Sequence, residues 1–177
     1  TNEEIDHRLL LDTFSRFIKY GHYNFNYNNK AIAATEGVNS KTNFIIDLSD
    51  EETVANSFTK SFTQSLHHTT GYDLTYLTAT TVEAIELYSH LYKHHLKDIT
   101  ETDYKNLIQL TEILTPKNKC FTKKIINKDG QTVSIALLLK DEKRLYNIIN
   151  ATNEEGRRTE ANYFLYAQIF SEYTGKG

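Results

Sequence analysis

The spacing of apolar residues predicts three short elements at the start of the chain. Residues 3–19 carry apolar side chains every three to four positions, the spacing of an amphipathic helix. Residues 22–27 alternate between polar and apolar side chains, and residues 44–48 form a short apolar run. We therefore expect a helix followed by two short strands.

A second helix is predicted after these strands. Ser49 and Glu52 have the S-x-x-E spacing of a capping box, in which each side chain bonds to the backbone of the other residue. An apolar stripe at helical spacing then runs from Val54 to Leu66. The pattern predicts one helix that ends near Gly71.

The next segment combines a strand with two helices. Residues 72–77 are typical of a strand. Two further capping boxes, Thr80–Glu83 and Thr100–Asp103, each precede an apolar stripe. They predict helices that end near Leu96 and Leu114.

Three β-rich runs follow one another in the second half of the chain. They span residues 120–126, 131–139 and 145–151, and the connections at 128–130 and 141–143 are short and polar. Short polar turns between β-rich runs are typical of hairpins. We expect one consecutive antiparallel meander.

The chain is predicted to end in a polar loop, residues 153–158, and a helix, residues 159–173. The residues of this helix expected to point partly inward are Ala161, Phe164, Leu165, Gln168 and Phe170. The order of elements predicts an α+β fold, in which helices flank a mixed sheet that contains the meander. We assign residues 1–71 to a leading helix–strand–helix segment and residues 72–177 to the core.

Composition narrows the class of protein. A chain of 177 residues with 39% apolar and 24% charged residues is typical of one globular domain. A single cysteine, Cys120, excludes an internal disulfide framework. The net charge of -3 gives no general attraction to nucleic acid, and no apolar run reaches the ~20 residues of a membrane helix. We expect a cytoplasmic protein without a membrane span, and the start at Thr1 together with the absence of methionine suggests an excised domain.

The order of elements, the run Ile46-Asp47-Leu48 and the segment N-E-E-G-R-R-T-E-A-N-Y-F-L at residues 153–165 resemble the GNAT acyltransferases. The resemblance is to their FemAB-like and BioF2-like branch, and it covers most of the chain. It implies the first two thirds of a GNAT fold, because Gly177 stands where a fifth strand and further elements of the family would follow. The oligomeric state and the extent of the native protein beyond both ends stay open.

The resemblance also implies a binding site for acetyl-CoA or another acyl-CoA. GNAT enzymes hold the pyrophosphate of the donor on the backbone of an Arg/Gln-x-x-Gly-x-Gly/Ala loop. Arg157 fits the first position of this pattern, whereas Glu160 and Asn162 stand where glycines are expected. The implied cofactor-binding residues are Ala151, Thr152, Gly156, Arg157, Arg158, Thr159, Ala161 and Asn162.

The implied activity is N-acyl transfer from a small-molecule acyl-CoA, or from an aminoacyl donor, to an amine acceptor. The helix around Lys60–His68 is less basic than in branches that use aminoacyl-tRNA, which weakens the case for that donor. No other nucleic acid is expected as a partner. The sequence identifies neither a general base nor a general acid, and it does not define the acceptor or the acyl group. The alternative is a non-catalytic interaction domain that keeps the GNAT scaffold.

Three other groups of residues have side chains that could bind a metal or take part in a reaction. Glu86, His90 and His94 recur at i, i+4 and i+8, but such a stripe is more often a solvated face than a metal site, and we expect no metal. Cys120 opens an apolar strand and is interpreted as a core residue. Asn147 and Asn150 either flank the pantetheine arm of a donor or simply face outward, and the sequence does not separate these readings.

Overall fold

The structure is a computed structural model that describes residues 9, 12, 13, 16, 17, 45–95, 99–142 and 144–176. The chain divides into two compact units, residues 1–45 and 46–177, and the second unit is described here. Apart from the five isolated residues, the predicted helix at 3–19 lies outside the described part, as does the predicted strand at 22–27.

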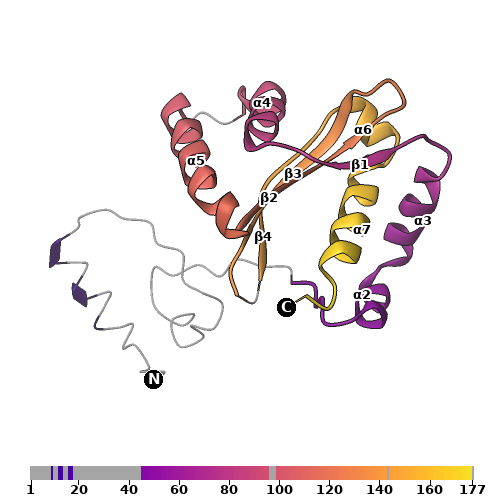
Figure 1. The fold of residues 1–177 in the computed structure, drawn as a ribbon, viewed down its shortest axis with the longest axis horizontal. Coiled ribbons are helices and arrows are strands. Elements are labelled where there is room, and N and C mark those ends of the chain that lie inside the picture. Colours follow the sequence, from indigo (N-terminus) through magenta and orange to yellow (C-terminus); the bar gives the residue numbers. More distant parts are fainter. Residues whose placement is uncertain are drawn as a thin grey trace. The chain divides into compact units, whose positions relative to one another are not determined.

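A four-stranded antiparallel sheet forms the centre of the second unit (Figure 1). Its strands are β1 (Thr75–Thr78), β2 (Cys120–Ile126), β3 (Thr132–Lys140) and β4 (Leu145–Thr152), and they lie side by side in this order. The predicted three-strand meander is therefore confirmed as β2, β3 and β4. The α+β class is confirmed as well, although the sheet of the described residues is antiparallel throughout where a mixed sheet was expected.

Helices cover both faces of this sheet (Figure 1). One face carries α4 (Thr81–Tyr92) and α5 (Glu101–Leu114), and the other carries α7 (Ala161–Tyr173). The helix α3 (Lys60–Thr69) packs against α7 from outside, where Phe62 meets the ring of Tyr163 at 5.4 Å between ring centroids. None of the helices in the described residues has the length and apolar character needed to cross a membrane.

Alternation along the strands produces one apolar core on each face. The core under α7 contains Ile125, Val133, Ala136, Leu138, Ala161, Leu165, Ile169 and Tyr173. The core under α4 and α5 contains Ala84, Ile85, Cys120, Ile135, Leu137, Ile149 and Ala151. Because β3 supplies buried residues to both cores, it is the strand that the two layers share.

Two of the three predicted capping boxes are present. Thr80 accepts a hydrogen bond from the backbone N–H of Glu83, whose carboxylate accepts one from the backbone N–H of Thr80. Thr100 and Asp103 make the same reciprocal pair at the start of α5. Each box satisfies donors that a helix start would otherwise leave unpaired.

The single helix predicted from Ser49 to Gly71 is wrong. Asp50 is the N-cap, and α2 (Glu51–Ser57) ends at Phe58, whose backbone is extended with a ψ of 126°. Thr59 then accepts a hydrogen bond from the N–H of Phe62 and starts α3. The interruption lets the ring of Phe58 stack on Phe62, with 4.3 Å between centroids.

Three further boundaries also differ from prediction. Residues 45–48 are not a strand, and the carbonyl of Leu48 accepts a bond from the N–H of Gly175 instead. β1 begins at Thr75 rather than residue 72, because Tyr72 bonds back to Thr69 in a turn. α4 ends at Tyr92, four residues before the predicted end, and a turn follows it.

A charged contact fixes the C-terminal half of α7 to β2. The Lys123 ammonium lies 2.7 Å from a carboxylate oxygen of Glu172, and the hydroxyl of Tyr76 donates to the other oxygen at 2.6 Å. The side chain of Lys123 is only 11% exposed, so its charge depends on this partner. Burial alone would raise the pKa of Glu172. The hydrogen bonds from Lys123 and Tyr76 lower it by more, so the pKa of Glu172 lies below its usual value.

We predict that Glu172→Gln destabilises the fold by about 1–3 kcal/mol at neutral pH, because Lys123 then keeps a buried charge without an ionic partner. A carboxyl group whose pKa is lower in the folded protein than in the unfolded chain stabilises the fold at pH values above its pKa in the unfolded chain. This stabilisation is lost as the pH falls through its pKa in the folded protein. The difference in Tm between wild type and Glu172→Gln should therefore shrink below about pH 4. Thermal unfolding from pH 3 to pH 8 measures it.

The matched control is Glu112→Gln, which removes an exposed carboxylate from α5. Its Tm should follow the wild type at every pH. Equal stability of Glu172→Gln and wild type at neutral pH would contradict the assigned role of the ion pair.

Candidate functional site at the junction of β4, α6 and α7

The segment predicted as a polar loop is a short helix, α6 (Glu154–Arg158). Asn153 begins it, because its side-chain oxygen accepts a hydrogen bond from the N–H of Gly156 at 2.8 Å. The same side chain donates to the carbonyl of Thr132 at 3.2 Å, and the backbone N–H of Asn153 donates to Val133 at 3.1 Å. The loop prediction failed because one asparagine both caps a helical turn and anchors it on β3.

Gly156 lies at the closest approach of α6 to the sheet. A Cβ at this position would be 2.1 Å from the carbonyl oxygen of Val133 and 2.8 Å from the methyl carbon of Thr152. The residue is buried, and because glycine has no side chain, α6 can pack directly against β3 here.

A buried polar network joins the first turn of α7 to β3 and β4. The side-chain oxygen of Asn162 accepts from Asn150 at 2.8 Å, and it lies 3.4 Å from the hydroxyls of both Ser134 and Thr152. Ser134 and Thr152 are 2.9 Å apart, and their relative exposures are 0% and 6%. Asn150 and Asn162 are partly buried, and the four groups satisfy one another, so the network fixes the position where α7 begins.

Glu160 connects α6 to α7 in a left-handed conformation, with φ 58° and ψ 24°. It is the N-cap of α7, but its side chain makes no capping hydrogen bond. Glycine adopts this conformation without strain, and Glu160 is one of the two positions where the GNAT pattern has glycine. A non-glycine residue therefore holds a backbone conformation that glycine adopts most easily.

The two arginines are the exposed cations of the junction. Arg157 donates from its guanidinium to the carbonyl of Thr152 at 2.8 Å, which holds its stem against the end of β4. The guanidinium of Arg158 lies 6.0 Å from the ring centre of Tyr72 and 3.9 Å from the carboxylate of Glu155. Both residues are exposed, so both can reach an anion in solvent.

The structure places all eight implied cofactor-binding residues in one region. Arg157 and Arg158 are exposed and Asn162 is half-buried, whereas the remaining five, Ala151, Thr152, Gly156, Thr159 and Ala161, are buried. The hydroxyl of Thr159 donates to the carbonyl of Glu155 at 2.9 Å. The backbone N–H groups of Gly156, Arg157, Thr159 and Glu160 also donate within the protein, so the exposed cationic groups of this region are the two guanidinium groups.

Sequence reasoning missed three residues of this junction. Asn153 could have been found as an Asn three positions before Gly156, the spacing of an N-cap. Ser134 interrupts the apolar run of β3, which could have marked a buried polar contact. Tyr166 gave no such signal: its hydroxyl bonds to Asn150, and burial raises its pKa to about 12.

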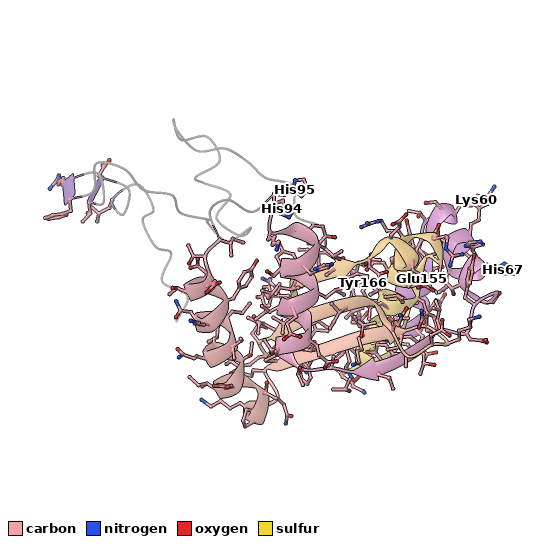
Figure 2. The ribbon with its side chains drawn as sticks, turned by 90° about the horizontal axis from the view of Figure 1, so that it is seen from above. Lys60, His67, His94, His95, Glu155 and Tyr166 are labelled. Carbon is pink, nitrogen blue, oxygen red and sulfur yellow. The ribbon has the colours of Figure 1, made fainter. Side chains whose placement is uncertain are left out.

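The other candidate residues lie elsewhere. Figure 2 shows His94 and His95 by the end of α4, well away from Glu155 and Tyr166 at the junction. Glu86, His90 and His94 are exposed as predicted, and no group of three or more potential metal ligands occurs within the described ranges. Cys120 is buried in the core under α4, and burial raises the pKa of its thiol.

The two asparagines of β4 have different environments. Asn147 is exposed, whereas Asn150 is partly buried and donates to Asn162. Asn150 is therefore not a plain outward-facing residue, whereas the exposure of Asn147 is compatible with both interpretations.

Comparison with known proteins found no match: no family model, curated protein or solved structure matches the chain.

We predict that Gly156→Ala destabilises the fold by about 1–3 kcal/mol, because the added methyl group forces α6 away from β3. Gly71→Ala is the matched control, since its Cβ would have only one neighbour within 4 Å, at an ordinary 3.6 Å. Chemical denaturation of both variants measures the difference. A Gly156→Ala protein as stable as Gly71→Ala would contradict the close contact.

We predict the opposite sign for Glu160→Gly, which should stabilise the fold by up to about 1 kcal/mol through relief of the left-handed conformation. Gln109→Gly, an exposed position inside α5, should instead destabilise it by about 1 kcal/mol. Parallel denaturation curves of the two variants test this contrast. Destabilisation of similar size in both would show that Glu160 carries no strain.

Proposed function

We propose that this chain is the donor-binding part of a GNAT-like N-acyltransferase, which transfers an acyl group from acyl-CoA or an aminoacyl donor to an amine. One observation carries the proposal. A strand, two helices and a three-strand meander lead through the short helix α6 into α7, in the order found in the first two thirds of the GNAT fold. The junction at the end of β4 stands where that family binds the donor.

The start of α7 has the physical properties that a pyrophosphate requires. A helix start presents unpaired N–H donors and the positive end of the helix dipole, and at α7 no side chain caps it. Arg157 and Arg158 add two positive charges next to it. The donor phosphates would lie over residues 156–162, with the acyl arm running along β4 and its asparagines.

Carboxylates near the junction oppose an anion. Glu155 is the least harmful, because its carboxylate accepts from the side chain of Asn127 at 3.0 Å and lies near Arg158. Glu154 and Glu160 have no such cation in the described contacts, so their charges reduce the affinity for phosphate. Because the charge of Glu160 is not offset in these contacts and lies at the start of α7, replacing Glu160 gives the clearest test of anion binding there.

The reaction would be direct attack of a neutral amine on the acyl carbonyl of the donor. The amine nitrogen forms the new bond to carbon, and the bond from that carbon to the donor sulfur or oxygen breaks. The donor leaves as a thiolate or alkoxide, and a general base or water takes the amine proton and passes it to the leaving group. Backbone N–H groups of a strand edge would polarise the carbonyl oxygen.

A non-catalytic interaction domain is the second candidate. It is favoured because residues of the junction already make contacts within the protein: Gly156 packs against β3, and the side chain of Asn162 contacts three neighbouring side chains. Acyl-CoA binding separates the two functions.

We predict that CoA and acetyl-CoA bind the chain in isothermal titration calorimetry. Arg157→Ala should weaken binding by about 1.5–3 kcal/mol, the size of a charge-assisted hydrogen bond. Glu160→Gly should tighten it, because it removes a negative charge near the pyrophosphate. Lys105→Ala, which removes an exposed cation from α5, is the control and should bind like wild type.

Absence of CoA binding in wild type and in Glu160→Gly would reject the acyltransferase proposal and favour the interaction domain. Equal weakening by Arg157→Ala and Lys105→Ala would show a nonspecific charge effect, and the site would then be placed wrongly.

A further inference from the structure

Two rings and a guanidinium group lie together beside the candidate site. Tyr72 follows α3, and its ring centre lies 5.3 Å from that of His68, with the two ring planes 76° apart. The guanidinium of Arg158, the last residue of α6, lies 6.0 Å from the centre of the same Tyr72 ring. We call Tyr72, His68 and Arg158 the stacking cluster. His68 and Arg158 are exposed and Tyr72 is half-buried, so a ligand in solvent can reach the cluster.

The packing of α3 against α7 brings the stacking cluster to the start of α7. Phe58, just before α3, contacts Phe170 in the last turn of α7. Phe62, in the first turn of α3, contacts Tyr163 in the first turn of α7. The two segments therefore run side by side in opposite directions (Figure 1). The end of α3 thus lies beside residues 156–162, over which the donor phosphates would lie.

The charges around the stacking cluster suit a neutral planar group better than a phosphate. The guanidinium of Arg158 lies 3.9 Å from the carboxylate of Glu155, and the exposed Asp73 directly follows Tyr72 in the sequence. These carboxylates would repel a phosphate. A purine base carries no charge, and it stacks on phenol rings and on the plane of a guanidinium. The cluster therefore has the chemistry of a site for a base, next to the proposed site for phosphates.

The packing of the described residues does not account for the ring of Tyr72. Among these residues, the Tyr72 side chain has the two contacts of the stacking cluster and no hydrogen bond. It belongs to neither of the two apolar cores. The ring can therefore be replaced without removing a core contact.

We propose that the stacking cluster binds the adenine base of an acyl-CoA donor whose pyrophosphate lies at the start of α7. The inference rests on the proposed function and makes the donor more specific. The donor is free acyl-CoA rather than a thioester on a phosphopantetheine arm alone or on a carrier protein, because these donors have no base. The ribose of CoA joins the adenine to the pyrophosphate, so the base must lie near the phosphate-binding residues, as the stacking cluster does.

Isothermal titration calorimetry of the full 177-residue chain tests the inference with two ligands, CoA and phosphopantetheine. Phosphopantetheine has the arm of CoA without the adenosine. Tyr72→Leu removes the ring and keeps an apolar side chain, so it should weaken CoA binding at least about fivefold and leave phosphopantetheine binding unchanged. Tyr72→Phe keeps the ring and is the matched control, which should bind both ligands like wild type. Thermal unfolding checks that both variants are folded.

The two ligands separate the failure of this inference from the failure of the proposed function. Equal CoA affinity of wild type and Tyr72→Leu would overturn the adenine site and leave the acyl-CoA proposal standing. Equal weakening of CoA and phosphopantetheine by Tyr72→Leu would also overturn it, because the ring would then act on something other than the base. A wild type that binds neither ligand would reject the proposed function, and the adenine site with it.

Discussion

The fold of the second unit depends on how closely α6 can approach β3. Gly156 lies against the carbonyl of Val133 at a distance that leaves no space for a side chain, and Asn153 bonds to Thr132 and Val133 on the same strand. These contacts turn the chain sharply at the end of β4. Because the turn is fixed, α7 must begin directly above the sheet, and everything that α7 buries follows from this starting point.

Polar contacts then fix α7 at both of its ends, while apolar side chains pack between them. Asn162 ties the first turn to β3 and β4, and Glu172 ties the last turn to Lys123 on β2. Leu165 and Ile169 lie between these contacts and are almost completely buried. Apolar packing alone would allow α7 to rotate or slide on the sheet, whereas the two polar contacts, each requiring its partner, define one register.

The elements that could be predicted from the sequence are those whose signal is local. Thr80 with Glu83 and the turns of the meander are read from a few neighbouring residues, and the structure has both. The break at Phe58 has one local signal, the N-cap residue Thr59 that starts α3, and one that no local pattern contains, the ring of Phe170, which lies 6.1 Å from the ring of Phe58 although it is over a hundred residues away in the sequence. Likewise, no local pattern shows that Glu160 is left-handed, since that conformation follows from the fixed positions of α6 and α7.

The candidate site shows that a glycine in a motif can have either of two structural roles. In a phosphate-binding loop, glycine lets an anion approach the backbone, and the sequence suggests this role for Gly156. In the structure the side that lacks a Cβ faces β3, so Gly156 brings two protein segments together rather than opening the backbone to solvent. The position that does have the glycine conformation at the start of α7 is Glu160, four residues later. An anion would thus be bound by the backbone after Glu160, on a helix start held rigidly by Asn162, so its binding would require little rearrangement of the protein.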